Sequence, residues 1–254
     1  MTVFAGQGDA RRSMSLLWRT PQDEEPRPGP KPGLSVEAIV EAAVAVADEQ
    51  GMAAVSMRAV GERLGRTGMA LYTYVPSKNE LVDLMYDHVL AELPSEYPPG
   101  GGWRAALTSW AHDMRAFYLR HPWVLQVSQA RPVLGPNEFQ SLETLAGVLS
   151  RTGLRARVLR GAVAALLDLV RGAARVIAEA EQAPTATGTS DDEWWTSRAA
   201  VLEEVAPGFA DRYPLVIWLQ TEDAAKWEER AEEAFGTELD LIMDGIETAV
   251  ARLP

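Results

Sequence analysis

Apolar residues recur every three or four positions along most of this chain, and this spacing limits its fold more than any other feature of the sequence. The clearest stretch covers residues 154–182, which are almost free of helix-breaking residues. No segment sustains the alternation of apolar and polar residues that a half-buried strand requires. The sequence therefore predicts an all-α protein.

Two segments rich in proline and glycine divide the chain. Residues 1–33 combine glycine, proline and charge, a composition that predicts a flexible or extended N-terminal arm. Residues 94–102 form the second such segment and mark the expected joint between two domains. We expect a three-helix helix-turn-helix domain, completed by a capped fourth helix, over residues 34–93 and a larger helical domain over residues 102–254.

The larger domain contains one further expected break. Residues 183–190 consist mainly of proline, threonine, glycine and serine, and they predict a loop after the long helix. Helices should resume over residues 191–205, near residues 214–220 and over residues 226–253.

Residues 56–78 carry the pattern that indicates a function. Their sequence, SMRAVGERLGRTGMALYTYVPSK, predicts two short helices on either side of a tight turn at residues 65–67. In a helix-turn-helix the second helix places its N-terminal side chains in the major groove of DNA. The segment has four basic residues and one acidic residue, whereas the whole chain carries a net charge of −12. A basic strip on an acidic protein is typical of site-specific DNA binding, although a helix-turn-helix can also be a purely structural corner.

The order and spacing of short motifs in this region resemble the DNA-binding domain of the TetR family of transcriptional regulators. The resemblance covers residues 34–93 and is carried by Ser56-Met57-Arg58, Leu64-Gly65, Leu71-Tyr72 and Pro76-Ser77-Lys78. The rest of the chain resembles, more loosely, the regulatory domain of the branch that includes the tetracycline repressor and actinomycete regulators of antibiotic export. The segments that carry this second resemblance are residues 103–106, 120–123, 135–137 and 241–247.

The resemblance implies two groups of DNA-contacting residues. Those implied to contact bases are Arg58, Met69, Ala70, Thr73 and Tyr74, and those implied to contact phosphates are Thr67, Tyr72 and Lys78. Many relatives have a polar or basic residue early in the recognition helix, where this chain has Gly68, Met69 and Ala70. Hydrogen-bonded reading of bases is therefore reduced, and apolar contact with thymine methyl groups remains available.

The N-terminal arm allows two interpretations. Arg27 and Lys31 lie in its proline-rich part and could enter the minor groove, as the arms of homeodomains do. The alternative is an arm that is simply disordered.

Tryptophan is the most conspicuous residue type of the larger domain, with seven of the eight tryptophans beyond Gly102. Such side chains pack in cores, but large flat side chains beside a few polar ones also suit a pocket for a flat apolar ligand. Both interpretations stay open. The candidate pocket residues are Trp110, Met114, Phe117, Phe139 and Trp194 as apolar walls, with Gln126 and Gln129 as polar anchors.

Two helices with wide apolar faces predict a homodimer. The resemblance implies that the helix over residues 154–182 and the C-terminal helix pair across a two-fold axis as a four-helix bundle. The residues expected at this interface are Val158, Leu166, Ile242 and Ile246.

Several classes of protein are excluded or disfavoured. The chain has no cysteine, so it has no disulfides and no thiolate metal site. It has no apolar run of about 20 residues, and its N-terminal residues predict no secretion signal. Its three histidines are far apart, and no nucleophile elbow, Walker loop or dinucleotide fingerprint is present. We therefore expect a cytoplasmic protein without enzymatic activity, metal, cofactor or membrane partner.

These observations predict a ligand-responsive transcriptional repressor. It should bind a palindromic double-stranded DNA operator as a dimer, and an aromatic or polyketide-like inducer should release it. An efflux or antibiotic-related gene is the expected target. One alternative is a helical carrier or enzyme with a vestigial helix-turn-helix. Another is an architectural DNA-binding protein without a ligand.

Overall fold

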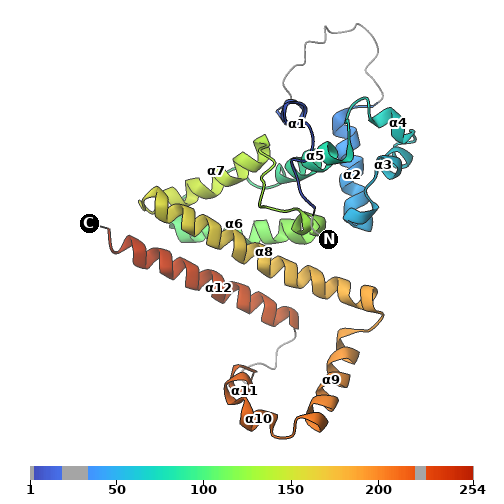
Figure 1. Cartoon of the computed structure of the whole chain (residues 1–254). Helices are drawn as coiled ribbons and strands as arrows, with labels where there is room; N and C mark the ends of the chain where they lie inside the picture. The colour runs from blue at the N-terminus through green and yellow to red at the C-terminus, as the bar shows by residue number, and fades with distance from the viewer. Residues whose placement is uncertain (1–2, 19–33, 221–226, 254) are drawn as a thin grey trace.

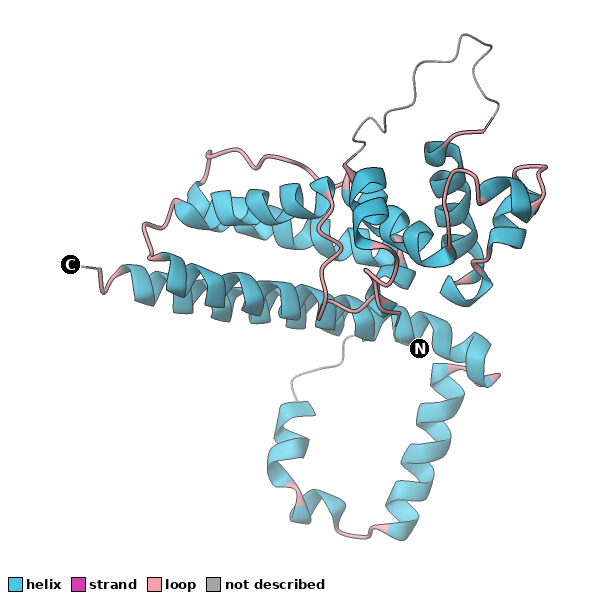
Figure 2. Ribbon diagram, turned by 45° about the horizontal axis from the view of Figure 1, so that its top comes forward, coloured by secondary structure: helices cyan, strands magenta, loops and turns pink. Residues whose placement is uncertain are grey.

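The computed structural model describes residues 3–18, 34–220 and 227–253, and every regular element in these ranges is a helix (Figures 1 and 2). The one strand-like contact among the described residues is an isolated bridge between Val3 and Val127. The prediction of an all-α fold is confirmed.

The N-terminal domain is built from short helices that begin at serine caps. The hydroxyls of Ser35, Ser56 and Ser77 each accept a hydrogen bond from a backbone N–H two or three residues further on, at 3.1–3.2 Å. Buried apolar side chains such as Ile39 and Leu71 then pack the helices together. The helices are α2 (Val36–Gln50), α3 (Met57–Arg63), α4 (Gly68–Leu71) and α5 (Lys78–Leu90), with the 3₁₀ turn η1 (Met52–Ala54) after α2.

The second domain is a bundle around one long helix. Its elements are α6 (Gly102–Arg120), the 3₁₀ turn η2 (Pro122–Gln126), α7 (Pro136–Ser150), α8 (Ala156–Thr187) and α12 (Trp227–Val250). The helix α8 packs against α6, α7 and α12, and it buries Leu166, Val170, Ala174 and Ala178, which are spaced by four residues on one face.

The end of α8 corrects one prediction. The loop expected over residues 183–190 is wrong for its first five residues, because the helix continues through Pro184 to Thr187. The hydroxyl of Thr187 donates a hydrogen bond to the carbonyl of Ala183 at 2.7 Å. The helix ends where Gly188 adopts φ +71°, and the N–H of Gly188 donates to Pro184 at 2.9 Å. Proline removes only one N–H donor, so the glycine was the stronger stop signal.

Three helices between α8 and α12 form an arm that extends away from the bundle (Figures 1 and 2). They are α9 (Asp191–Val205), α10 (Phe209–Arg212) and α11 (Pro214–Gln220). A reciprocal capping box between Ser190 and Glu193 begins α9. The arm exposes a run of large apolar side chains, namely Trp194, Trp195, Val201, Leu202, Val205, Tyr213, Leu215, Val216, Trp218 and Leu219.

The described part of the N-terminal segment is folded. Residues 3–18 include the helix α1 (Ala10–Leu17), which packs against α5, and they bury Ala5 and Leu17. The expectation of a flexible arm is therefore wrong for these residues, because their backbone donors find acceptors on the rest of the chain. Arg27 and Lys31, the proposed minor-groove residues, lie outside the described residues.

Candidate nucleic-acid interface and ligand cavity

The helices α3 and α4 form a close helix-turn-helix at the outer edge of the N-terminal domain (Figure 1). A glycine at position 61 permits this packing, because a Cβ there would lie 2.9 Å from the carbonyl oxygen of Arg66. The N–H of Arg66 donates to the carbonyl of Gly61 at 2.8 Å and closes the turn. Buried Leu71 and Val75 anchor the second helix from behind.

The side chains implied to contact DNA occupy the outer surface of this unit. Met69 is 75% exposed, and Arg58 extends into solvent, where its Nε donates to Glu62 at 2.8 Å. Arg58 would have to release the carboxylate of Glu62 before its guanidinium could contact a base or a phosphate. Thr67, Tyr72, Thr73 and Lys78 are exposed, and Ala70 and Tyr74 are half-buried.

A cavity of about 290 Å³ lies in the second domain. Its walls come from α5, α6, α7, α8 and the loop of residues 127–134, and they are mainly apolar. Trp110, Met114 and Leu145 form part of the apolar wall. A concave, largely apolar space with a few polar groups is the usual form of a small-molecule site.

The polar groups of this cavity include two tyrosines, an amide, a carboxyl group, two serines and the guanidinium of Arg131. Gln129 donates through Nε2 to the hydroxyl of Tyr118 at 3.5 Å, and Tyr86 and Glu138 also face the space. Burial raises the pKa of both tyrosines and of Glu138. The tyrosines therefore remain protonated donors, which suits a ligand that carries carbonyl or phenol oxygens.

The helix α5 connects this cavity to the DNA-binding domain. Tyr86 and Leu90 belong to the cavity wall, while the same helix packs against α2 beside the helix-turn-helix. Asp87 accepts hydrogen bonds from the backbone N–H groups of Asn137 and Glu138, at 3.0 and 2.9 Å, and so holds the first turn of α7. One helix therefore contacts the cavity and the DNA-binding head.

A second connection passes through a buried histidine at the junction of the domains. Nδ1 of His121 lies 2.8 Å from Asp48 on α2, and its Nε2 lies 3.2 Å from Glu92, just beyond α5. Asp48 also accepts from the indole N–H of Trp123 at 2.8 Å. This cluster fixes α2 against the second domain.

The sequence matches known proteins over nearly its whole length. The description "Bacterial regulatory proteins, tetR family" matches residues 39–85, and "Tetracyclin repressor-like, C-terminal domain" matches residues 94–250. The chain is 40% identical over 254 residues to the HTH-type transcriptional repressor DrrR1 of Streptomyces coeruleorubidus, covering 99% of this chain and 90% of that protein. This chain belongs to the TetR family of transcriptional regulators. The resemblance predicted from its short motifs is confirmed.

Other relatives extend this comparison. An HTH-type transcriptional regulator of Saccharopolyspora erythraea is 28% identical over 228 residues, which cover 90% of this chain and 91% of that protein. The fold is similar to that of apo ActR from Streptomyces coelicolor, with a TM-score of 0.68 at 22% identity over 87% of this chain and all of that one.

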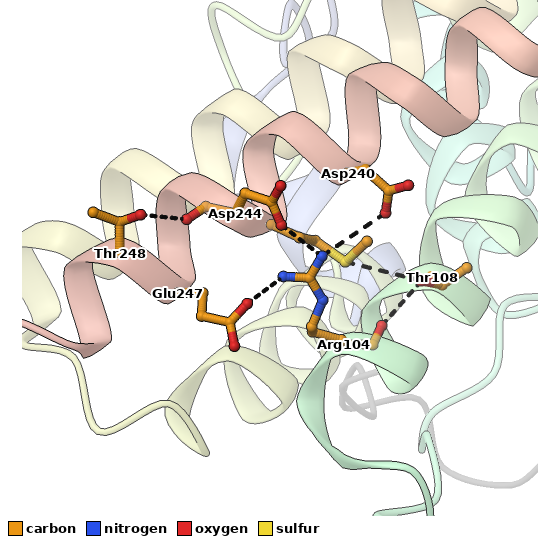
Figure 3. A network of polar contacts seen from close by, with 7 residues as sticks. Arg104, Thr108, Asp240, Asp244, Glu247 and Thr248 are labelled. Carbon is orange, nitrogen blue, oxygen red and sulfur yellow. Dashed lines mark hydrogen bonds and ion pairs between the residues drawn. The ribbon is translucent and has the colours of Figure 1, made fainter.

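Two of the four segments that carried the looser resemblance to the TetR regulatory domain, residues 103–106 and 241–247, meet in space. Arg104, in the first turn of α6, contacts Asp244 and Glu247 on α12 at 2.8 Å each, and Asp240 at 3.9 Å (Figure 3). Thr108 donates to the carbonyl of Arg104 at 3.0 Å, one turn further along α6. This network joins residues 103–106 to residues 241–247 and holds α12 against α6.

The structure brings together four of the seven predicted ligand residues of this TetR regulator. Trp110, Met114, Gln129 and Phe139 line the cavity. Sequence reasoning missed Tyr86 and Leu90, because α5 was assigned to the DNA-binding domain alone, and it also missed Tyr118, Glu138 and Leu142. Two features of the sequence could have indicated that α5 also contacts the second domain: its apolar stripe and its end at the domain joint.

The other three predicted ligand residues lie elsewhere. Phe117 is fully buried and packs against the rings of Tyr118 and His121, so it belongs to the core. Gln126 faces a separate pocket with Arg175. Trp194 is on the arm, where its exposed ring meets Trp195 edge to face. None of these three residues lines the cavity of the single chain, which corrects their prediction as cavity walls or anchors.

The four residues predicted at the dimer interface differ in their exposure in the single chain. Val158 is exposed and Ile242 is half-buried, whereas Leu166 and Ile246 are buried in the single chain. The latter two pack within the chain's own bundle, since α8 contacts α12 there, and they are not available to a partner. Among the side chains that the structure describes on these two helices, the large apolar ones that are exposed are Val158, Val176 and Leu241.

Two kinds of site are absent from the described part of the chain. Within residues 3–18, 34–220 and 227–253, no three carboxylates or histidines are grouped closely enough to hold a metal ion. None of the helices in these ranges is both long and apolar enough to cross a membrane.

Proposed function

We propose that this chain is a ligand-responsive transcriptional repressor. It binds a palindromic operator as a dimer, and a small aromatic or polyketide-like molecule in the cavity releases it. The observation that carries the proposal is the double role of α5, which supplies Tyr86 and Leu90 to the cavity and packs against α2 of the DNA-binding domain. A tilt of α5 changes the distance between two recognition helices that must match fixed half-sites.

The ligand class is supported by relatives and by the shape of the cavity. The similar fold of ActR is known in complex with actinorhodin (TM-score 0.68, 22% identity), and a TetR variant of Acinetobacter baumannii is known in complex with minocycline (TM-score 0.59). The apolar wall and protonated tyrosines of the present cavity suit such molecules, and an efflux or antibiotic-related gene is the proposed target.

The dimer is supported by exposed apolar surface. The arm presents Trp195, Leu215 and Leu219 at 67–73% exposure, and so many large apolar side chains exposed on one arm favour a covering partner. On α8, the exposed positions between Gly161 and Gly172 are mostly glycine or alanine, which let another helix approach closely. A second copy of the chain would cover both surfaces.

The DNA-binding part of the proposal can be tested with two substitutions. A duplex selected from a random pool by the wild-type chain serves as the operator. Arg58→Ala should cost roughly 1–3 kcal/mol and relax preference at one base position. Lys78→Ala should weaken all sequences about equally and reduce the slope of log affinity against log salt by about 1.

Fluorescence anisotropy at several salt concentrations measures both effects. Arg252→Ala removes an exposed arginine beyond α12 and serves as the matched control. If both variants bind like the control, the proposed recognition surface is wrong. If the wild-type chain selects no duplex at all, a helical carrier or enzyme becomes the better reading of the cavity.

The ligand-binding part can be tested by filling the cavity. Ser141 lies half-buried on the wall contributed by α7, and Ser141→Trp should occupy much of the 290 Å³. Actinorhodin or minocycline should release the wild-type chain from its operator, with a coupling of about 5–150-fold, and should leave the variant bound.

The comparison needs a substitution of similar size outside the cavity. Ser109→Trp, at an exposed position of α6, should respond to the antibiotics as the wild type does. Release of the Ser141→Trp variant at wild-type antibiotic concentrations would place the ligand elsewhere.

A further inference from the structure

Residues 3–18 form a strap that is tied to the cavity loop at its start. The N–H of Val3 donates to the carbonyl of Gln126 at 2.8 Å, and the carbonyl of Val3 accepts from the N–H of Ser128 at 2.7 Å. Val127 and Ser128 belong to the cavity wall. The first residues of the strap therefore add a short parallel bridge to one end of the loop of residues 127–134.

The last residue of the strap holds the other end of the same loop. The indole N–H of Trp18 donates to the carbonyl of Leu134 at 3.0 Å, and the Trp18 ring lies 6.2 Å from the ring of Phe139. Leu134 and Phe139 also line the cavity. Leu134 has φ +63°, an unfavourable backbone conformation for a leucine, so contacts with the rest of the protein must maintain the conformation of this end of the loop.

Between these two ends, the strap is bound to α5. The N–H of Gly6 donates to Asp83 at 2.8 Å, and the N–H of Asp9 donates to Glu80 at 3.3 Å. Both carboxylates are buried, at 2% and 4% exposure. The strap is in close contact here, because a Cβ at Gly8 would collide with the carboxylate of Glu80. Buried carboxylates need such donors, so the strap and α5 depend on each other.

We propose that residues 3–18 carry the response between the cavity and the DNA-binding domain, as a mechanical link between the loop of residues 127–134 and α5. The inference rests on the proposed function. A ligand that displaces the loop pulls on both ends of the strap, and the strap is fixed to two successive turns of α5 at Glu80 and Asp83. The direct contact of α7 with Asp87 holds the next turn of α5. The strap thus extends the link towards the recognition helix.

The test uses reciprocity, which requires that DNA binding alters the cavity loop if the loop alters DNA binding. Hydrogen–deuterium exchange of residues 127–134 is measured in the full-length protein with and without the selected duplex. In the wild type, the duplex should change the exchange rates of this loop by about 5-fold or more. Two variants then cut the strap at different ends.

The cavity-end variant combines Val3→Pro with Trp18→Ala, and it removes both donors to the loop while leaving the contacts to α5. The helix-end variant is Gly8→Ala, whose Cβ displaces the strap from Glu80. Arg11→Ala, at an exposed position of α1, is the control. Circular dichroism establishes that each variant is folded, and the cavity-end variant replaces no fully buried residue in case Gly8→Ala is unstable.

The expected result is that both strap variants still bind the duplex but no longer transmit the change to residues 127–134, whereas the control does. A strap that is only a brace would lower stability in both variants and leave the change in loop exchange intact, which would overturn the inference. An unchanged loop in the wild type on DNA binding would overturn it equally. Failure to select any duplex is the distinct outcome that contradicts the proposed function itself.

Discussion

A chain that carries Val158→Glu and Leu241→Glu should be a folded monomer that has lost most of its operator affinity. Both side chains are exposed in the single chain, Leu241 at 68%, so the substitutions leave the internal core intact. In the proposed dimer they face a second copy, and a carboxylate buried there without a partner costs several kcal/mol. Each of the two chains carries two substitutions, so the interface would contain four such charges. They should raise the dissociation constant of the dimer by a factor of roughly 1000 or more.

Operator binding should decline with dimerisation. A monomer binds one half-site only. It therefore lacks the increase in operator affinity that two linked DNA-binding domains provide, which amounts to roughly 100- to 10,000-fold. Sedimentation velocity measures the mass, and anisotropy measures the affinity. Leu253→Glu, beyond the last turn of α12, is the control that adds a charge at another exposed leucine. A double variant that remains dimeric would move the interface to another surface.

The choice of these positions follows from the structure. The apolar stripes of the sequence suggest Leu166 and Ile246 as interface residues, but both are buried between helices of one chain. A charge at either position would unfold the protomer and would say nothing about the dimer.

Replacing Asp83 by asparagine should stabilise the protein at neutral pH and alter its dependence on pH. Burial raises the pKa of this carboxyl from 3.8 to about 6; the N–H of Gly6 partly opposes the rise, and nearby Glu80 adds to it. A carboxyl whose pKa is higher in the folded state binds more protons there between about pH 4 and pH 6. The free energy of unfolding therefore falls as pH rises through this window and is level above it.

Asparagine keeps an oxygen to accept the Gly6 N–H and carries no charge to bury. Asp83→Asn should thus raise the free energy of unfolding by roughly 1–3 kcal/mol at pH 8, with a smaller gain at pH 5.5. Urea denaturation across this range measures the difference. Glu41→Gln, at an exposed position of α2, should show no such trend, and Asp83→Ala should be destabilised because the Gly6 N–H loses its acceptor. A pH-independent effect of Asp83→Asn would show that the buried charge is not the cause.

Local signals in the sequence determine the secondary structure and the DNA-binding motif of this protein. Serine caps at Ser35, Ser56 and Ser77 begin three helices of the N-terminal domain, and such capping involves only neighbouring residues. The spacing of residues 56–78 identifies the helix-turn-helix for the same reason, since its two helices are close in the chain. The composition of residues 3–18 was misleading, because their acceptors on α5 are more than 70 residues away.

The composition of the cavity and of the free surfaces was decided only by the tertiary structure. Met114 and Phe117 share the apolar stripe of α6, yet Met114 lines the cavity and Phe117 packs in the core. Helical periodicity shows which face of a helix is buried, but it does not show what covers that face. For α8 and α12 the same stripe could have met a second chain or the chain's own bundle. The packing of these helices against each other decided which residues were left for a partner, and the folding of residues 3–18 onto α5 decided what joins the cavity to the DNA-binding head.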